Sequence, residues 1–475
     1  MTLLYLPALM VTGLDQAWAA NKSAGAKSSQ SKSSAARKNI AKHAAPKPEA
    51  KKEHAELPGA EEVVEPNGIT SRLVAMGAST RPAMMLWGRN TPKYVRAGFF
   101  RYAVLQTDGH SAILYQRPEK DPDRSWKQIW KSRPDVHQPP TLLVDRHGRL
   151  HVLYVDMLGT LKHVIFNGSR AGVLEFAGTV STRRSWGLGN FYMGAAYNRV
   201  TDAVLVCSSN FTSGVLRCGS FQEEHWSAPR NIASLNDQLF LYPIVEPAGT
   251  YAWVASSAYK RGQSFGSRTT NIVLPIDSTT GARTYARQAA TYGSTEINRV
   301  FFESDAAIDH HGNLALLVTP VPAGAKAKVD DTVAMFNAGN GFALPPPIEG
   351  VRGSAYTLFN LQDGIYFVGA GTLGLSKDDG HSWTLHKYEL ARFPHAKFEY
   401  GVAQSLQARS GTAWPADRVS FLQELVDRDS KRKFVVEIDL DPAQQPIESV
   451  VLPAAKSASR IPAAVQNRIP VKLKH

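Results

Sequence analysis

Apolar and polar residues alternate in short runs along most of this chain, and turns rich in Asp and Gly separate the runs. The stretch from Pro139 to Phe166 contains three such runs, at Thr141–Val144, Leu150–Val155 and Leu161–Phe166. Alternation with a period of two is typical of strands that bury one face, so this stretch predicts an antiparallel meander. Residues 306–317 repeat the turn chemistry and apolar spacing of residues 142–153. One meander cannot bury its apolar face alone, so the repeat predicts neighbouring copies.

Hairpin turns of this kind recur at intervals of roughly 40 to 60 residues. They lie at Thr107-Asp108-Gly109, His147-Gly148, Val200-Thr201-Asp202, Pro247-Ala248-Gly249, His311-Gly312, Asp363-Gly364 and Ser410-Gly411. No stretch has the pattern of a long amphipathic helix. The seven turns predict an all-β fold, a single β-propeller of seven blades, each a four-stranded antiparallel sheet, over residues 61–453, with six or eight blades as the alternatives. A strand from Ser71–Trp87 is expected to close the ring against the last blade.

The two ends of the chain differ in composition from the middle. Residues 1–20 are expected to be a signal peptide, because Leu3–Leu14 is apolar and Ala17-Trp18-Ala19 is a small-x-small cleavage motif. Residues 21–60 are rich in Ala, Lys, Ser and Pro, and are expected to form a disordered basic tether. Residues 454–475 are expected to be a basic disordered tail. We therefore expect a bacterial protein that is periplasmic or secreted.

The net charge of +13 is concentrated in these tails. Residues 21–60 contain nine Lys or Arg and three acidic residues, and residues 454–475 contain five Lys or Arg and no acidic residue. The tails are therefore expected to attract an anionic envelope polymer. No nucleic-acid-binding motif accompanies the charge, so nucleic acid is not an expected partner. A monomer is expected.

The chain has only two cysteines, Cys207 and Cys218. A hairpin with its tip at Thr212-Ser213 would place them directly opposite each other. Opposite positions of an antiparallel pair can suit a disulfide, and export would permit one to form. The alternative is a pair of buried free thiols.

Residues 376–383 read Ser-Lys-Asp-Asp-Gly-His-Ser-Trp and fit the Asp-box pattern, Ser-x-Asp-x-Gly-x-x-Trp. In this pattern, which begins at Ser376, the Asp378 carboxylate accepts N–H groups of the turn, Gly380 allows a positive φ, and Trp383 packs into the blade. Glu119–Trp126 keeps the Asp and Trp spacing and is interpreted as a decayed copy. Such a box indicates a fold better than a function.

With these motifs, the chain resembles the BNR/Asp-box propellers, which include sialidases, and more closely the propeller polysaccharide lyases of the ulvan-lyase type. Residues 135–140, Asp-Val-His-Gln-Pro-Pro, resemble the His-Asn-x-Pro start of the second blade in that group. Asp145–Val152 resembles its Asp-x-x-Gly-x-x-His-Val motif, and Tyr115-Gln116-Arg117 followed by a Trp completes the likeness. The resemblance covers residues 95–260. It implies an enzyme that cleaves uronate-containing acidic polysaccharide by β-elimination, without metal or cofactor.

A uronate lyase must neutralise the substrate carboxylate, remove the C5 proton and protonate the leaving oxygen. By resemblance His137 matches the catalytic His, and Gln138 either contacts the carboxylate or caps the strand. Tyr242, in Tyr-Pro, resembles the family's acid or base, and Tyr192 holds a similar place one blade earlier. The structural alternatives are a loop-bonded His137 and core packing of both tyrosines. The expected substrate-binding cations are Arg261 and Lys260.

Other features bear on the same chemistry. Arg183-Arg184-Ser185-Trp186 is a carbohydrate-like cluster, in which Arg184 or Arg183 can pair with an acid group and Trp186 can stack on a sugar; a solvated loop is the alternative. His310-His311 is a weak metal signal, because no third ligand follows at a suitable spacing. The family's second catalytic His has no counterpart, since Asp156 or Met157 takes its place, and His163 falls on the following strand.

Two further functions remain open at this point. One is a non-catalytic glycan-binding or envelope-assembly propeller, which the missing second His favours. The other is a sialidase-like glycoside hydrolase, which needs three arginines around a substrate carboxylate and a Tyr paired with a Glu. Its Arg-Ile-Pro letters occur at Arg460-Ile461-Pro462, but within the C-terminal tail rather than near the start of the chain.

Overall fold

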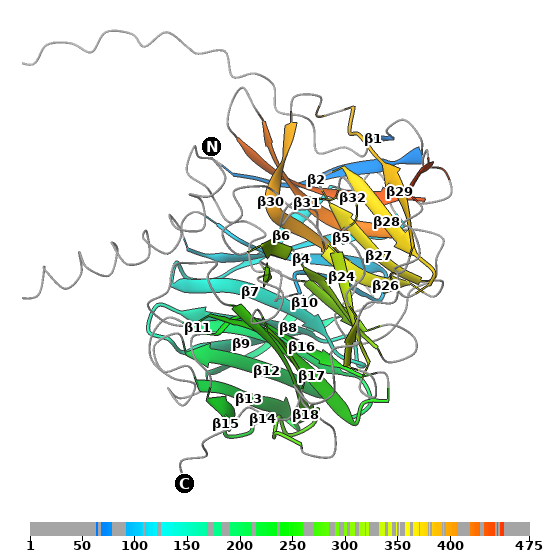
Figure 1. Cartoon of the computed structure of the whole chain (residues 1–475). Helices are drawn as coiled ribbons and strands as arrows, with labels where there is room; N and C mark the ends of the chain where they lie inside the picture. Colours follow the sequence, from blue (N-terminus) through cyan, green and yellow to red (C-terminus); the bar gives the residue numbers. More distant parts are fainter. Residues whose placement is uncertain are drawn as a thin grey trace, which may run out of the picture. The chain divides into compact units, whose positions relative to one another are not determined.

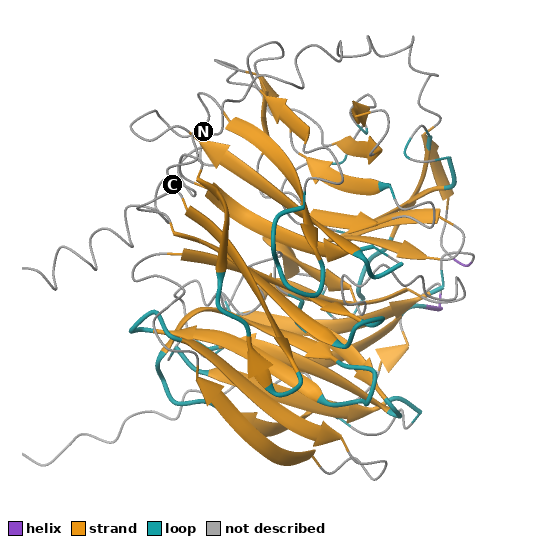
Figure 2. Ribbon diagram, turned by 90° about the horizontal axis from the view of Figure 1, so that it is seen from below, coloured by secondary structure: helices purple, strands orange, loops and turns teal. Residues whose placement is uncertain are grey.

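The structure is a computed structural model of the chain, and for parts of several strands it describes the backbone alone. It describes residues 63–64, 68–77, 92–107, 110–120, 125–168, 174–181, 191–210, 215–234, 238–246, 248–259, 269–284, 290–293, 299–301, 305–308, 313–318, 320–322, 332–337, 341–343, 348, 351, 357–361, 364–369, 371–378, 380, 382–391, 393, 396–405, 419–427, 432–441, 444 and 447–450. These residues are almost entirely β-strand (Figure 2). No α-helix is among the described elements. In this part of the chain, no helix has the length and apolar character that crossing a membrane requires.

The predicted all-β fold is confirmed, and the strands form a β-propeller of small antiparallel sheets (Figure 1). In the described residues, six sheets are meanders of successive strands. The first sheet contains β3 (Tyr94–Ala97), β4 (Phe100–Gln106), β5 (Ala112–Pro118) and β6 (Lys127–Lys131). The second contains β7 (Val136–Val144), β8 (Leu150–Asp156), β9 (Leu161–Gly168) and β10 (Leu174–Ser181).

The next four meanders follow in chain order. The third sheet contains β11 (Phe191–Asn198), β12 (Ala203–Asn210), β13 (Val215–Gln222), β14 (His225–Trp226) and β15 (Arg230–Ser234). The fourth contains β16 (Gln238–Val245), β17 (Tyr251–Tyr259), β18 (Thr269–Asp277) and β19 (Ala290–Gly293). The fifth contains β21 (Asp305–Ile308), β22 (Leu314–Val318), β24 (Thr332–Asn337) and β25 (Gly341–Ala343). The sixth contains β26 (Thr357–Leu361), β27 (Gly364–Gly369), β28 (Thr372–Ser376), β29 (Trp383–Lys387) and the late strand β33 (Ile447–Val450). A separate pair joins β20 (Arg299–Phe301) to β23 (Pro320–Pro322).

A seventh sheet combines the two ends of the propeller. Its strands, in order, are β1 (Val63–Val64), β2 (Thr70–Met76), β32 (Lys433–Leu440), β31 (Val419–Asp427) and β30 (Ala396–Ser405). Antiparallel pairing of β2 with β32 sets Thr70 opposite Asp439 and Met76 opposite Phe434. The predicted closing strand is thus confirmed as far as residue 76. Seven turns predicted seven blades; the structure has six local meanders and this composite sheet.

One predicted turn joins a different pair of strands from the others. Thr107–Gly109 separates β4 from β5, the second and third strands of their sheet, whereas His147-Gly148 separates the first and second strands. The first turn of the first sheet is at Gly98 and Phe99, where Gly98 has a φ of 59°. That turn carries no Asp, and apolar residues flank it, so the pattern of polar turns does not reveal it.

The apolar core lies between neighbouring sheets. Val104 and Leu114 of the first sheet cluster with Leu142 and Val152 of the second, all fully buried. A similar cluster joins the second sheet to the third. Each sheet therefore buries both faces against its neighbours, which is why β8 is buried at every position.

Strand order defines two faces of the propeller. The first strands of successive sheets contact one another, β3 with β7, β7 with β11, β11 with β16 and β16 with β21, so the first strand of each sheet is innermost. Blades are related by rotation about the propeller axis, so their innermost strands begin on the same face. We call this the proximal face. The turns that join first to second strands, and third to fourth strands, lie on the opposite, distal face.

Candidate functional site

His137 lies on the proximal face, as the second residue of the innermost strand β7. Its side chain is half-buried. The pairing of β7 with β8 shifts register between Val136 and Gln138, and again between Gln138 and Thr141, so His137 lies in a bulged part of the strand. Bulges re-aim side chains and are common beside active sites. The backbone therefore presents a partly accessible imidazole near the start of a strand whose residues 139–143 are buried.

Backbone hydrogen bonds hold the chain on both sides of His137. The amide of Val136 donates to the carbonyl oxygen of His110 at 2.8 Å, which ties β7 to the first sheet. The amide of Met157 donates to the carbonyl oxygen of Asp135 at 2.8 Å, which ties the same segment to the β8–β9 turn. A side chain presented from a segment held in this way is positioned with little freedom.

A tyrosine and two carboxylates lie near this end of the second sheet. Burial first, and then the negative charges of Asp135 and Asp156, raise the pKa of Tyr154 to about 12. The Tyr154 hydroxyl therefore keeps its proton at neutral pH and can donate a hydrogen bond, but it is a poor base. Asp135 Oδ1 is shielded from solvent and has no hydrogen-bond partner within the described ranges.

Asp156 is one of the two residues that replace the family's second His, and its carboxylate is committed to a turn. Its Oδ1 accepts the amides of Leu158 at 2.9 Å and Thr160 at 2.8 Å. Its Oδ2 lies 3.4 Å from Lys162 Nζ. These bonds close the β8–β9 turn in the manner of an Asx turn. The other replacement, Met157, is 53% exposed and has no acid–base chemistry.

The other predicted catalytic residues are described only by their backbone. Tyr192 is the second residue of β11, the same place that His137 holds in β7, and Gln138 follows His137. Tyr242 is further along its strand, at the fifth position of β16. The remaining candidates fall outside the described residues: Lys260, Arg261, Arg183, Arg184 and Trp186. Their convergence with His137 stays a prediction.

The weak metal signal at His310-His311 also falls outside the described residues. Within the described ranges, no three His, Cys, Asp or Glu side chains are grouped so that they could hold a metal ion. The chemistry expected of His137 requires only proton transfer at a positioned side chain.

The motif that resembles Asp-x-x-Gly-x-x-His-Val takes part in a buried hydrogen-bonded network near the distal face. Its members are Asp145, His151 and His163. His151 Nε2 lies 3.2 Å from Asp145 Oδ2, and His151 Nδ1 lies 2.8 Å from His163 Nε2. With Asp145 ionised, the tautomers follow: His151 Nε2–H donates to Asp145, and His163 Nε2–H donates to His151 Nδ1. His163 Nδ1 is then a bare nitrogen, and no described residue hydrogen-bonds to it.

Burial and the neighbouring groups shift the pKa values of His163 and Asp145 within this hydrogen-bonded network. Burial first, and then the unfavourable electrostatic interactions with His151 and Arg149 when His163 is protonated, hold the pKa of His163 well below its usual value. Burial alone would raise the pKa of Asp145, but hydrogen bonds from His151 and Arg149 lower it instead. The His163 ring packs edge-on against Phe221, with centroids 4.5 Å apart. These histidines join the second sheet to the third and are closed to a substrate.

A second buried polar group, which the sequence did not predict, lies between the composite sheet and the first sheet. Arg101 Nη1 lies 2.8 Å from Glu437 Oε1 and 2.6 Å from Asp439 Oδ1. Arg117 Nε donates to Glu437 Oε2 at 2.5 Å, and Arg72 Nη1 donates to Asp439 Oδ2 at 2.6 Å. Every charge in the group therefore has an opposite charge beside it, as buried ions require.

This cluster has the residue types of a sialidase site but not its accessibility. The hydroxyl of Tyr94 donates to Glu437, which gives a Tyr–Glu pair beside three arginines. However, Glu437 and Asp439 fill the positions around the arginines that a substrate carboxylate would occupy, and Arg117 is 1% exposed. We interpret the cluster as a structural junction. The sequence feature that could have revealed the cluster is the spacing of Glu437 and Asp439. They are two residues apart in an apolar strand, so both lie on the same face of it.

The turn between β28 and β29 has the hydrogen bonds expected of residues 376–383. Ser376 Oγ donates to Asp378 Oδ1 at 2.9 Å, and the amide of Ser382 donates to the same oxygen at 2.8 Å. Gly380 has a φ of 84°, and Trp383 Nε1 donates to its carbonyl oxygen at 3.2 Å. This turn lies on the distal face, away from His137. Its membership of an Asp-box repeat stays a prediction.

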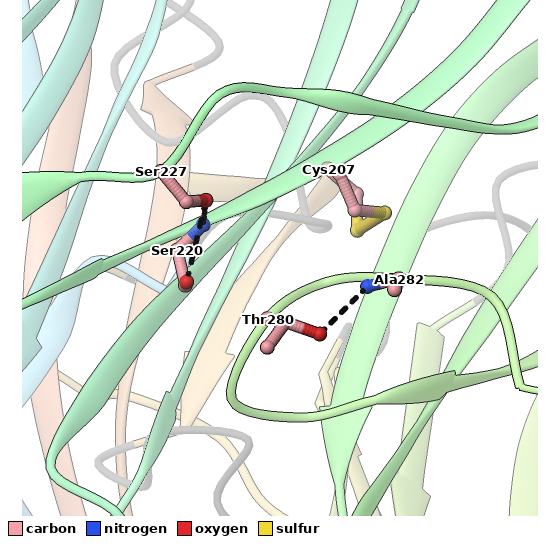
Figure 3. Close-up of a disulfide and its surroundings, with 6 residues drawn as sticks. Cys207, Ser220, Ser227, Thr280 and Ala282 are labelled. Atoms are coloured by element: carbon pink, nitrogen blue, oxygen red, sulfur yellow. Dashed lines mark hydrogen bonds between the residues drawn. A yellow bond between two sulfur atoms is a disulfide. The ribbon is translucent and has the colours of Figure 1, made fainter.

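The predicted disulfide between Cys207 and Cys218 is confirmed. The two residues are direct partners in β12 and β13, and both are fully buried. A turn of the fourth sheet lies beside the disulfide, where Ala282 N–H donates to Thr280 Oγ1 at 3.3 Å (Figure 3). A Cβ on Gly281, whose φ is +68°, would come within 3.0 Å of the Cys218 backbone. The crosslink is therefore packed between the third and fourth sheets.

Searches with protein-family models and among curated proteins found no match. Among solved structures, the chain is similar to a PL25 ulvan lyase at 11% identity, over 79% of this chain and 95% of that chain, with a TM-score of 0.45. It is similar to the polysaccharide lyase Uly1 at 8% identity, over 78% and 92%, with a TM-score of 0.45. It is also similar to the BP39L lectin from Burkholderia pseudomallei at 12% identity, over 76% and 99%, with a TM-score of 0.46. Identities this low do not indicate a shared activity.

Proposed function

We propose that this propeller cleaves uronate-containing acidic polysaccharide by β-elimination, with His137 as an acid–base residue. The observation that carries the proposal is the placement of His137, half-buried in a bulge where the innermost strand β7 begins. A general acid or base must reach the proton it moves, and a residue at the end of an innermost strand is placed to meet a polymer that crosses the proximal face.

The reaction requires three groups. A base removes the C5 proton of the uronate, the electrons of that bond form the C4–C5 double bond, and the C4–O bond breaks. An acid gives a proton to the departing oxygen, so the products are an unsaturated uronate end and a hydroxyl end. A cation or amide must neutralise the uronate carboxylate, because negative charge develops beside it as the proton leaves.

The proposal assigns these roles to residues from the sequence. His137 and one of Tyr192 and Tyr242 serve as base and acid. Gln138 stands next to His137 and is assigned to the carboxylate. Trp186 is assigned to stacking on a sugar ring. The residues assigned to pairing with acid groups of the substrate are Arg261, Lys260, Arg183 and Arg184.

A glycan-binding propeller without catalysis is the second candidate. The observation that favours it is the use of Asp156, which closes a turn where the resembled lyases have a histidine. In this case His137 and the surrounding groups would bind acidic sugars by hydrogen bonds and charge alone.

Cleavage of a panel of uronate polymers, followed by the ultraviolet absorbance of unsaturated ends, tests the proposal. His137→Ala should lower the rate by about 10²–10⁴-fold, the usual share of a general acid or base, while polymer binding persists. His147→Ala is the matched control, because His147 is 57% exposed on the distal face. If the wild type forms no unsaturated product from any polymer, or His137→Ala cleaves like the wild type, the binding propeller replaces the lyase.

We also propose that the chain is exported to the periplasm or beyond. The apolar stretch Leu3–Leu14, the cleavage motif at residues 17–19 and a buried disulfide all support export, because disulfides persist in oxidising compartments. Fractionation of cells that express the full chain checks this. Recovery of full-length protein in the cytoplasm with both thiols reduced would contradict it.

A further inference from the structure

The segment that joins β6 to β7 approaches His137 from the rim of the first sheet. β6 is the outermost strand of its sheet and ends at Lys131, and β7 begins at Val136. The side chains of Lys131, Arg133 and Pro134 are exposed. Neither Lys131 nor Arg133 forms an ion pair with any residue that the structure describes. Among the described residues, these two exposed cations therefore have no direct ion-pair partner.

The backbone of this segment is held rigidly while these side chains remain exposed. The amide of Ala112 donates to Ser132 Oγ at 2.9 Å, and Ser132 Oγ donates to the carbonyl oxygen of Arg133 at 2.6 Å. Gln106 Nε2 donates to the carbonyl oxygen of Val136 at 3.3 Å. Because the chain is already ordered, a ligand that binds these cations pays little additional backbone entropy.

The β8–β9 turn meets the same segment and adds apolar surface. Met157 and Leu158 are 53% and 64% exposed, and the amide of Met157 donates to the carbonyl oxygen of Asp135. The Asp156 carboxylate and Gly159, whose φ is 76°, fix the turn that carries them. Large apolar side chains held out into solvent beside a site are commonly contact surfaces.

We propose that Lys131 and Arg133, together with Met157 and Leu158, form a binding subsite for the acidic polysaccharide that leads to His137. The inference rests on the proposed function, and it adds where the polymer lies. A pair of cations beside a pair of exposed apolar side chains suits a chain of sugar rings. The carboxylate or sulfate groups pair with Lys131 and Arg133, and the C–H faces of the rings pack on Met157 and Leu158.

Binding of polyglucuronate to the full chain, measured by calorimetry at two salt concentrations, tests the subsite. The double variant Lys131→Ala/Arg133→Ala should weaken binding about tenfold and reduce its salt dependence, because two screened charge contacts are lost. Met157→Ser/Leu158→Ser should weaken binding and leave the salt dependence unchanged. Lys127→Ala is the matched control, since Lys127 is an exposed lysine at the other end of β6. All these positions are exposed, so the melting temperature should not change.

The outcomes separate this inference from the lyase proposal. Loss of cleavage with intact binding in His137→Ala supports the catalytic role and leaves the subsite standing. Unchanged polyglucuronate affinity in Lys131→Ala/Arg133→Ala overturns the subsite, whether or not the protein cleaves polymer. Equal loss of binding to polyglucuronate and to phosphatidylserine vesicles, or wild-type binding to vesicles alone, also overturns it, because the surface would then serve a membrane.

Discussion

Arg117 and Glu437 form a buried, two-point ion pair across 320 residues of chain, with Nε–Oε2 and Nη2–Oε1 distances of 2.5 and 2.7 Å. Arg117 belongs to β5 of the first sheet and Glu437 to β32 of the composite sheet. The pair therefore joins the two ends of the propeller by side chains, next to the backbone pairing of β2 with β32 that closes the same sheet.

Glu437→Ala should destabilise the fold by about 3–5 kcal/mol, the cost of leaving buried charges without a partner. Arg101 and Arg117 would both lose a carboxylate that they contact directly. Denaturant unfolding monitored by tryptophan fluorescence measures the change. Glu224→Gln is the control: Glu224 pairs with Arg149 at a 58% exposed position, and an exposed pair is worth at most about 1 kcal/mol. Equal effects from the two substitutions would show that the junction is not the closing element.

The stability of the propeller should fall as the pH drops below about 6.5, because of His163. Burial holds the pKa of this imidazole well below its usual value, so the unfolded chain takes up a proton that the folded chain excludes. The groups around it are Asp145, His151 and Arg149; Asp145 stays ionised, since its own pKa is lowered. His163→Gln, which keeps a donor for His151, should flatten the dependence of the melting temperature on pH between about pH 6.5 and 5.

A second loss of stability is expected at lower pH, from the closing cluster. Burial alone would raise the pKa of Asp439, but Arg101 and Arg72 lower it to about 2. Its contribution is therefore present above about pH 4 and is lost as the pH falls toward 2. Asp439→Asn should abolish the loss of stability between about pH 4 and 2. The loss of stability that His163 causes between about pH 6.5 and 5 should remain. A single transition shared by both variants would contradict the separate assignment of the two steps.

The disulfide should leave no free thiol and should stabilise the fold. Thiol titration of the denatured, unreduced protein is expected to find none, because Cys207 and Cys218 are the only cysteines and are bridged. Replacing both with Ala should cost about 2–4 kcal/mol in chemical unfolding. Reduction under native conditions should be slow, since both residues are fully buried. Two rapidly reacting thiols in the native protein would contradict the pairing.

Asp378→Ala should lower stability by about 1–2 kcal/mol without affecting polymer binding. The carboxylate accepts hydrogen bonds from Ser376 and from the amide of Ser382, and their loss leaves the turn donors partly unsatisfied. The turn is on the distal face, so the His137 region is unchanged. Lys377→Ala, an exposed neighbour in the same turn, serves as the control. A loss of polymer binding in Asp378→Ala at full stability would place the turn in the binding site instead.

Local pattern and turn chemistry were sufficient to predict an all-β fold of antiparallel meanders, because short apolar runs separated by polar turns pair with their neighbours in sequence. The turn at Gly98 could not be predicted from polar turn residues, because its neighbours are apolar or basic and contain no Asp. The pairing of Cys207 with Cys218 was predictable for the same local reason: only the tip of one hairpin had to be placed correctly.

Side chains that meet across the ring were not predictable in this way. Glu437 lies 320 residues from Arg117 and 336 residues from Arg101, and a single sequence does not indicate which distant charges share a junction. Resemblance placed His137 at the start of an inner strand, where the structure has it. It also suggested a motif histidine at residue 151, which the structure instead buries against His163. A motif gives residue types, whereas accessibility depends on the neighbouring sheet.

The pairing of β2 with β32 also sets an order of events during synthesis. Arg72 leaves the ribosome 367 residues before its partner Asp439. At about 5–20 residues per second, the early strand waits roughly 20–70 s for that partner. During this time its unpaired edge can template pairing with another chain, and only the arrival of the last strands removes the hazard. The nascent chain therefore needs either protection of the unpaired edge of β2 or rapid completion of synthesis, so that β2 can pair with β32.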